Sequence, residues 1–263
     1  MPKRSYMRRP LGGAVILAGQ VLHAARRSDL PTLRNQDPSG VFGSSDAPCV
    51  RIVLLGDSSI TAPGVDPLDA AWPRRLAHRL ADRYQVELVS VAVGGAKAHD
   101  VLHSQVEPAL AAGADLALLS VGANDALRGT PIRRFECEFS EILDRLVAGV
   151  GGVGVSGVGD LGTLPRLPHL ARGIGRVRGR AIDGAIRRAV AAHPGVVKGS
   201  AWGPGWAVFA EGDPGVYFAP DRFHASAEGH AVFAAAAAPV VDALLARRER
   251  TATRGLFDAG RTQ

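Results

Sequence analysis

The sequence predicts an α/β protein: a doubly wound, flavodoxin-like, three-layer sandwich with a mainly parallel sheet of five strands between two layers of helices. Two observations lead to this prediction. Short apolar runs rich in branched residues alternate with longer segments whose apolar residues recur at helical spacing. Several of the apolar runs stop at glycine, which is typical of strands that are buried on both faces. The chain has 263 residues, enough for one such domain with its own core.

The first expected strand begins at Arg51 and stops at Gly56. Later expected strands are Val86 to Val93, Leu116 to Val121, Val153 to Val158 and Val196 to Ala201. Expected helices are Leu68 to Tyr84, His99 to Ala112, Pro131 to Val147, Ala171 to His193 and Ser226 to Arg248. In the last of these, Pro239 is expected to interrupt the helix. Strands that alternate with helices at this spacing form a parallel sheet covered on both faces.

This regular pattern divides the chain into three parts. Residues 1–48 are a basic and apolar segment with a linker, residues 49–250 the α/β domain, and residues 251–263 a basic flexible tail. Leu11 to Ala25 carry no Asp, Glu, Lys or Arg, but this run is short for a transmembrane span. A signal, an anchor and a packed amphipathic helix all stay open. We expect a cytoplasmic protein, with peripheral membrane contact through residues 1–30 and secretion as alternatives.

The net charge limits the possible partners, and the cysteine content limits the possible disulfides. The net charge of +6 comes mostly from arginine and would suit nucleic acid or an anionic membrane. No nucleic-acid-binding motif accompanies it, so we expect a solvated basic surface and no nucleic-acid partner. Cys49 and Cys137 are expected to be free thiols. The sequence does not indicate the oligomeric state.

Two patterns that elsewhere mark ligand sites are weak here. Gly149, Gly151 and Gly154 match G-x-G-x-x-G, but a helix precedes them and a strand follows, the reverse of a dinucleotide fingerprint. His99 and His103 stand four residues apart on an expected helix without a further ligand nearby, which favours surface histidines over a metal site. We therefore expect neither a metal nor a cofactor.

Side chains suited to acyl transfer follow the ends of the expected strands. Acyl transfer through serine needs a base, a group that orients the base, and donors for the oxyanion. Because the carboxyl ends of parallel strands share one edge of the sheet, residues that follow different strands can meet there. The candidates are Ser58, Gly95 with Gly94 as the close alternative, Asn124, Asp221 and His224.

Four short blocks in this order resemble the motifs of the SGNH (GDSL-like) hydrolases. They are Gly56-Asp57-Ser58, Gly94-Gly95, Gly122-Ala123-Asn124-Asp125 and Asp221-x-x-His224. The resemblance covers about residues 51–248 and implies a serine-dependent ester hydrolase that works through an acyl-enzyme, on a small-molecule, lipid or sugar ester. It implies that Ser58 is the nucleophile, His224 the general base and Asp221 its orienting acid. The backbone N–H groups of Ser58 and Gly95 and the side chain of Asn124 would form the oxyanion hole.

Some positions depart from the family pattern, and some roles stay open. Ser59 stands where leucine is usual, Lys97 where threonine is frequent, and Ala225 where proline is frequent. None of these removes a catalytic group. An acyltransferase with the same site chemistry, and a non-catalytic membrane-associated binding module on this scaffold, remain as alternatives.

Other residues near the expected site have supporting roles. Asp57 and Asp125 are expected to hold their loops through backbone N–H groups. His230 is expected on the last helix rather than in the site. Trp202 and Trp206 either shape an acyl or sugar pocket or belong to the core.

Overall fold

The structure is a computed structural model that describes residues 28–259. The expected signal, anchor or membrane contact within residues 1–30 falls almost wholly on residues 1–27, which lie outside the described part. Within it, strands form one sheet in the order β1-β3-β2-β4-β5-β6. The strands are β1 (Gly40–Phe42), β2 (Cys49–Gly56), β3 (Gln85–Ser90), β4 (Leu116–Ser120), β5 (Gly152–Val155) and β6 (Val197–Lys198).

The order of the strands confirms the predicted fold class. β2 lies between β3 and β4, and the neighbouring pairs from β3 to β6 are all parallel. These parallel strands therefore follow the flavodoxin-like order, second, first, third, fourth, fifth. The sheet has one strand more than the five expected, because β1 pairs antiparallel with β3 inside the segment predicted as a linker. A three-residue edge strand is too short to give a hydrophobic period.

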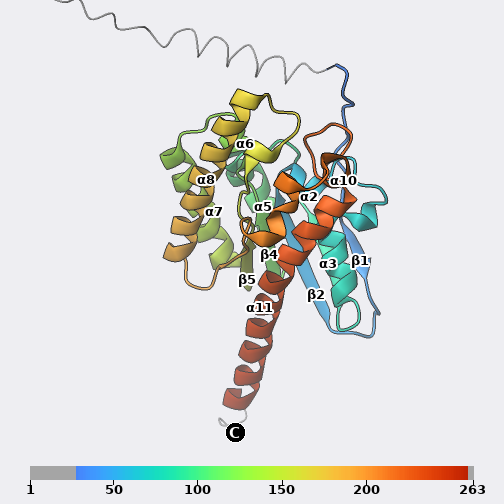
Figure 1. The fold of residues 1–263 in the computed structure, drawn as a ribbon. Coiled ribbons are helices and arrows are strands. Elements are labelled where there is room, and N and C mark those ends of the chain that lie inside the picture. The colour runs from blue at the N-terminus through green and yellow to red at the C-terminus, as the bar shows by residue number, and fades with distance from the viewer. Residues whose placement is uncertain (1–27, 260–263) are drawn as a thin grey trace, which may run out of the picture.

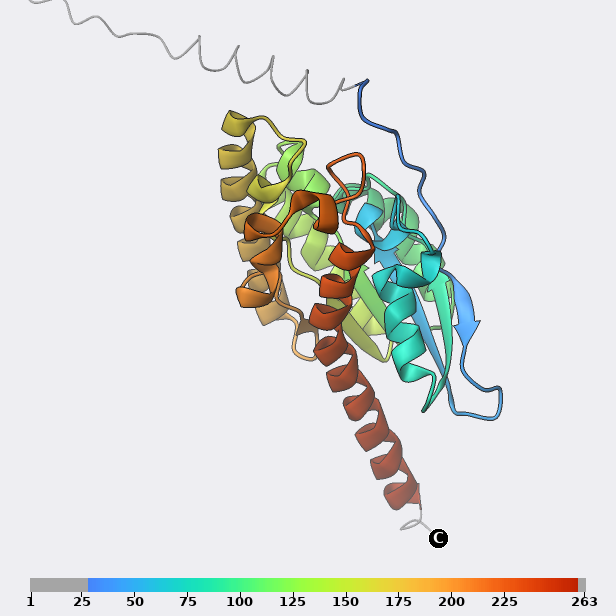
Figure 2. The same ribbon diagram turned by 45° about the vertical axis from the view of Figure 1, so that its right-hand side comes forward.

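Helices cover both faces of the sheet, as Figures 1 and 2 show. Alternate side chains of a strand point to opposite faces. Val53 and Leu55 of β2 share one core cluster with residues of α7 (Ile132–Gly149) and α8 (His169–Ala192). Ile52 and Leu54 share another with residues of α3 (Trp72–Leu80) and α11 (Ala227–Ala259). The described helical segments longer than three residues are α2 (Ser58–Thr61), α3 (Trp72–Leu80), a π-helical turn (Val101–Gln105), α5 (Val106–Ala111), α6 (Ala123–Leu127), α7 (Ile132–Gly149), α8 (His169–Ala192), α9 (Val208–Glu211), α10 (Pro214–Tyr217) and α11 (Ala227–Ala259).

α11 differs from the prediction in two ways. An interruption is predicted at Pro239, but the helix runs through it. Proline removes the hydrogen bond to the carbonyl group four residues earlier, which belongs here to Ala235. Both residues are exposed, so water can satisfy that carbonyl. The helix also continues to Ala259, into the segment predicted as a flexible tail, and Figure 2 shows this end projecting beyond the sheet.

Among the described residues, α11 is the one helix that is long and apolar enough to cross a membrane, judged by length and composition only. A core helix of a globular protein passes the same test, so the indication is weak. Val240, Val241 and Leu244 of α11 lie in the core cluster on this face of the sheet. Packing against the sheet therefore accounts for part of the apolar character of α11, since a third of its most apolar stretch is buried.

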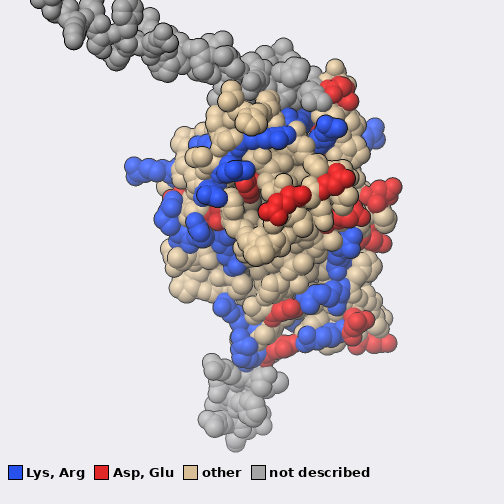
Figure 3. Space-filling model, in the orientation of Figure 1, with Lys and Arg blue, Asp and Glu red and all other residues tan. Residues whose placement is uncertain are grey.

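Basic and acidic side chains are interspersed over the face seen in Figure 3. Many described arginines pair with carboxylates, as Arg51 does with Glu87 and Arg188 with Glu136. Exposed pairs of this kind contribute little to stability, but each carboxylate neutralises the charge of its arginine, which reduces the local positive charge of the surface. Cys49 and Cys137 are both exposed free thiols, as predicted.

Candidate active site

The loop after β2 presents Ser58 at the first position of α2. Gly56 has a φ of +144°, and a Cβ atom there would overlap the carbonyl group of Ser120, so the turn requires glycine. Asp57 then caps α2, because its Oδ1 accepts a hydrogen bond from the N–H of Ser59 at 2.9 Å. Within the described part of the chain, neither the hydroxyl nor the N–H of Ser58 has a hydrogen-bond partner. Both groups are therefore free to meet a ligand.

Asp57 is buried beside this serine, and burial raises its pKa to about 6. Hydrogen bonds from Ser59 and Asn124 act in the opposite direction but do not cancel the effect of burial. This carboxyl group carries the cap of α2 and contacts Asn124, so it joins two of the candidate loops. It holds its own loop, as the sequence predicts for Asp57.

Asn124 lies on α6, which follows β4 at the same edge of the sheet. Its side-chain Nδ2 donates to Oδ2 of Asp57 at 3.3 Å and to the carbonyl oxygen of Ala96 at 3.2 Å. Both distances are long for N–H···O bonds, whose usual value is about 2.9–3.0 Å. The amide thus lies between the loop of Ser58 and the loop of Gly95, and its two N–H groups are only loosely engaged.

The loop after β3 carries the two candidate glycines. Gly95 has a φ of +82°, a left-handed conformation that favours glycine. At Gly94 a Cβ atom would overlap the side chain of Asn35. Neither glycine N–H has a hydrogen-bond partner among the described residues. The backbone conformation at Gly95 therefore favours glycine, whereas a side chain at Gly94 would require the Asn35 side chain to move. The choice of Gly95 over Gly94 stays a prediction.

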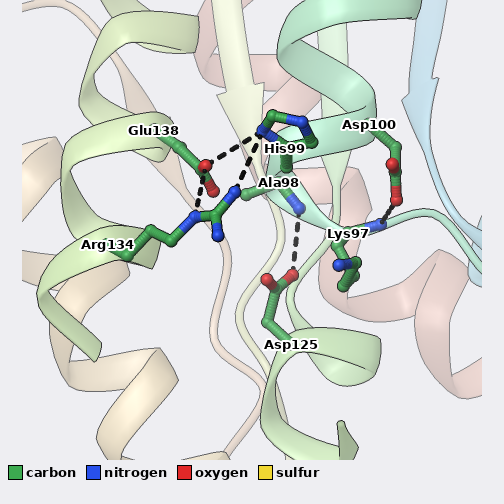
Figure 4. Close-up of polar contacts among 7 residues, drawn as sticks. All are labelled: Lys97, Ala98, His99, Asp100, Asp125, Arg134 and Glu138. Atoms are coloured by element: carbon green, nitrogen blue, oxygen red, sulfur yellow. Dashed lines mark hydrogen bonds and ion pairs between the residues drawn. The ribbon is translucent and has the colours of Figure 1, made fainter. Parts of the chain in front are cut away.

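Asp125 fastens this loop to α6, as Figure 4 shows. Its Oδ2 accepts the N–H of Ala98 at 3.0 Å, which agrees with the predicted loop-holding role. Burial raises the pKa of this carboxyl group. In the same view His99 contacts Glu138, which also binds Arg134. Among the described residues there is no group of three or more His, Cys, Asp or Glu side chains suited to a metal ion.

Asp221 and His224 form a hydrogen-bonded pair just before α11. Nδ1 of His224 lies 2.6 Å from Oδ2 of Asp221, while Oδ1 of Asp221 accepts the backbone N–H groups of Phe223 and His224, each at 3.0 Å. Burial alone would raise the pKa of Asp221, but these hydrogen bonds outweigh it and leave the pKa below its ordinary value. Because an ionised Asp221 can only accept a hydrogen bond, the neutral imidazole of His224 must carry its proton on Nδ1. Nε2 is then the atom that can accept a proton.

One cavity of about 340 Å³ reaches the loops that carry these residues. Asp57 and Ser59, on either side of Ser58, line it. Phe223 and Ala225, on either side of His224, line it as well, as does Ala123 beside Asn124. Segments far apart in the sequence therefore border one cavity, but Ser58, Asn124 and His224 themselves are not among its lining residues. Trp202 and Trp206 also line it, which favours their pocket role over a place in the core.

The departure at Ser59 has a structural reason. Its hydroxyl lies 2.6 Å from that of Ser120, which in turn accepts the hydroxyl of Ser156 at 2.8 Å. Ser59 is therefore tied to the ends of β4 and β5, whereas Ser58 is not. His230 lies on α11, as predicted. Its Nδ1 is buried and accepts the backbone N–H of Trp72 at 3.2 Å.

Two anchors of the site, the buried Gln105 and the partly buried Arg178, give no signal in the sequence. Gln105, in the π-helical turn, accepts the N–H of Gly56 at 2.8 Å and donates to the carbonyl oxygen of Gly56 at 2.9 Å. Arg178 of α8 donates to backbone carbonyl oxygens around the end of α6. Both hold the loops that carry candidate residues. Neither stands in a motif.

Comparisons with known proteins agree with this fold. The sequence model of the GDSL-like Lipase/Acylhydrolase family matches residues 54–232. Among solved structures, TesA is 21% identical with a TM-score of 0.59, over 74% of this chain and 99% of that chain. The psychrotrophic esterase EstA from Pseudoalteromonas sp. is 14% identical with a TM-score of 0.58, over 74% of this chain and 98% of that one. Axe2, an acetylxylan esterase from Geobacillus stearothermophilus, is 16% identical with a TM-score of 0.52, over 74% and 93%. No curated protein sequence matches the chain.

Proposed function

Because the chain belongs to the GDSL-like lipase/acylhydrolase family and is an enzyme that hydrolyses carboxylic esters, we propose that it does so through an acyl-enzyme on Ser58. The observation that supports this most directly is the single cavity lined by the chain neighbours of Ser58, His224 and Asn124. A nucleophile, a base and an oxyanion donor on loops that border one cavity are what acyl transfer needs.

His224 is the general base of the proposed reaction. Its Nδ1 is held at 2.6 Å by Asp221, which fixes the tautomer and leaves Nε2 to take the proton of the Ser58 hydroxyl. Asp221 stays ionised at neutral pH because its pKa lies below the ordinary value, so it also stabilises the imidazolium that forms. The Ser58 oxygen then attacks the ester carbonyl carbon. His224 afterwards gives the proton to the leaving alcohol.

The developing oxyanion would be held by three N–H donors. The backbone N–H groups of Ser58 and Gly95 have no acceptor among the described residues, so no hydrogen bond must break before they bind the oxyanion. The loosely bound amide of Asn124 supplies the third donor. A water molecule, deprotonated by His224, then attacks the acyl carbonyl and releases the acid and Ser58.

The test uses the two adjacent serines as a matched pair. With a fluorophosphonate probe and with p-nitrophenyl acetate, Ser58→Ala should abolish labelling and lower kcat by about 10³ or more. Ser59→Ala should keep labelling, because that hydroxyl is bonded to Ser120. Labelling that survives in Ser58→Ala, or is lost only in Ser59→Ala, would contradict the proposal. A phosphonate is a reasonable probe, since the EstA structure is described as inhibited by monoethylphosphonate.

A further inference from the structure

Arg128 places a guanidinium group beside Gly95. It caps the end of α6, the helix that carries Asn124, and its backbone N–H donates to the carbonyl oxygen of Asn124 at 2.9 Å. A Cβ atom on Gly95 would stand 3.3 Å from Nη2 of Arg128, and among the described residues no other atom outside the adjacent residues would come within 4 Å of it. That point is two covalent bonds from the backbone nitrogen of Gly95. The positive charge therefore lies next to a proposed donor of the oxyanion hole.

The guanidinium group of Arg128 has no partner of its own. Most described arginines bind an acceptor: Arg134 pairs with Glu138, and Arg178 donates to backbone carbonyl oxygens. The side chain of Arg128 makes neither an ion pair nor a hydrogen bond with any described residue, and it is exposed. Its N–H donors, whose planar arrangement fits a carboxylate or a phosphate, are therefore available to a ligand.

The charges on the loops of the site, residues 56–59, 94–98, 122–128 and 221–225, differ in burial according to their sign. Each acid is buried and accepts hydrogen bonds within the protein, whereas no cation is buried or forms an ion pair among the described residues. The acids are Asp57, Asp125 and Asp221, and the cations are Lys97, Arg128 and Arg222. Figure 4 shows Asp125 bound to the backbone of Ala98, beside Lys97. The charge that these loops present to solvent is therefore positive.

We propose that Arg128 binds a negatively charged group of the substrate while the ester carbonyl is at Ser58, so that the enzyme prefers esters that carry a carboxylate or a phosphate. The inference rests on the proposed function, because it names the substrate class of the same site. The anionic group belongs either to the acyl part or to the alcohol, since both are attached to the carbonyl carbon that Gly95 would hold. A charge-assisted hydrogen bond is stronger than a neutral one, and an effect of about tenfold in kcat/KM is expected for it.

The first experiment compares two matched pairs of esters, each consisting of an anion and its neutral methyl ester. For the acyl side the pair is mono-p-nitrophenyl adipate and p-nitrophenyl methyl adipate. For the alcohol side the pair is 4-acetoxybenzoate and methyl 4-acetoxybenzoate. In at least one pair kcat/KM should be about tenfold higher for the anion, and that pair shows which side of the ester carries the charge.

Substitutions then test whether Arg128 causes the preference. Arg128→Gln should lower the ratio of anionic to neutral kcat/KM by about tenfold. The ratio is the informative quantity, because loss of a positive charge beside Gly95 also affects the oxyanion of every ester. Arg128→Lys keeps the charge but not the planar pair of donors, so it should restore part of the ratio. Arg250→Gln is the matched control at an exposed position of α11 beyond the core residue Leu245, and it should leave the ratio unchanged.

The second experiment measures binding without turnover. By isothermal titration calorimetry, Ser58→Ala should bind the anion of at least one pair about tenfold more tightly than its methyl ester. Ser58→Ala combined with Arg128→Gln should bind the two alike. Thermal unfolding checks that each variant is folded, which is expected because the side chain of Arg128 bonds to no described residue.

The outcomes separate this inference from the proposed function. If neutral esters are hydrolysed through Ser58 but neither anion is preferred, or if Arg128→Gln keeps the preference, the inference is refuted while the nucleophile stands. An equal loss in Arg250→Gln also overturns it, because the net charge of the protein, and not Arg128, would then attract the anion. If Ser58 is unreactive, the proposed function fails, and the titration still decides whether Arg128 binds an anion.

Discussion

Asn124 connects the loop that carries the candidate nucleophile to the loop of Gly95 through two long hydrogen bonds, to Asp57 and to the carbonyl oxygen of Ala96. In the proposed reaction its amide turns toward the oxyanion, where charge develops only in the transition state. Asn124→Ala should therefore lower kcat by about 10²–10³, with a smaller effect on KM. Steady-state kinetics with p-nitrophenyl acetate measure both constants.

The same substitution leaves Oδ2 of Asp57 and the carbonyl oxygen of Ala96 without this donor, so a loss of stability of about 1–3 kcal/mol is expected. Thermal unfolding separates that effect from the loss of turnover, provided that kinetics are measured well below the transition. Turnover within a factor of three of wild type in the folded variant would mean that Asn124 only ties the two loops together.

Some of the candidate residues could be predicted because local sequence marks them. Ser58 and Asn124 follow glycines at the ends of buried strands, and Asp221 and His224 stand three residues apart before a helix. Gln105 could not be predicted, because its hydrogen bonds join it to Gly56, 49 residues away in sequence. A buried glutamine is recognised only when its distant partner is known.

At the scale of elements, the segment before β2, which was predicted to be a linker, also makes hydrogen bonds to the end of α2. The backbone N–H of Gln36 donates to Thr61 at 2.8 Å, and its Nε2 donates to the carbonyl oxygens of Ala62 and Val65 at 2.8 and 2.9 Å. Ala62 ends α2 with a φ of +45°, an unfavourable conformation for a residue other than glycine. Gln36 thus holds the strained end of the helix that begins at Ser58.

Gln36→Ala should loosen α2. We expect a loss of about 1–2 kcal/mol in the free energy of unfolding and slower labelling of Ser58 by a fluorophosphonate. Arg34→Ala, two residues earlier and exposed, is the matched control and should change neither. Gln36→Glu should be worse than alanine, because a carboxylate would face two carbonyl oxygens. Equal labelling rates in all variants would show that the segment does not position the serine.

The sequence predicts buried elements better than edge elements for a physical reason. β2 and β4 are buried on both faces, so nearly every residue in them is apolar and the run is conspicuous. β1 is held by main-chain hydrogen bonds to β3 and has one buried side chain, that of Phe42. The residues on either side of β1 are rich in proline, glycine and serine, which are common in loops, and this is why a linker was expected there.

At the scale of the whole molecule, the topology of the sheet can be predicted from the sequence, but the cavity between the sheet and α11 cannot. Convergence of the candidate loops follows from a parallel sheet, since all its strands end at the same edge. The cavity between the sheet and α11 does not follow, because it depends on which side chains fail to fill a layer formed by distant segments. Gly154 and the alanines of α11 are visible in the sequence, but only the folded chain shows that Gly154, Ala236 and Ala237 line the same cavity.

The stability of the molecule should fall in acid because of a histidine in this same layer. Burial lowers the pKa of His230 to about 3, and Coulombic repulsion from Arg75, and from His224 once it is protonated, acts in the same direction. His230 is 1% exposed and its ring accepts the backbone N–H of Trp72, so the folded protein keeps the ring neutral. In the unfolded chain an ordinary histidine titrates near 6.5. The unfolded state therefore binds the extra proton between about pH 6.5 and pH 3, and folding stability is lost as the pH falls through that window.

His230→Asn keeps an acceptor for the N–H of Trp72 but cannot be protonated. The shorter side chain lowers stability by an amount that does not depend on pH, so the slope of stability with pH is the informative quantity.

Asp57 acts in the opposite sense, because its raised pKa makes the folded state bind the proton between about pH 6 and pH 3.8. That contribution is common to both proteins and cancels in the comparison. Urea unfolding between pH 7.5 and pH 5 should show wild type losing about 2 kcal/mol relative to His230→Asn. Parallel curves for the two proteins would mean that the buried imidazole is protonated in the folded state or reaches water.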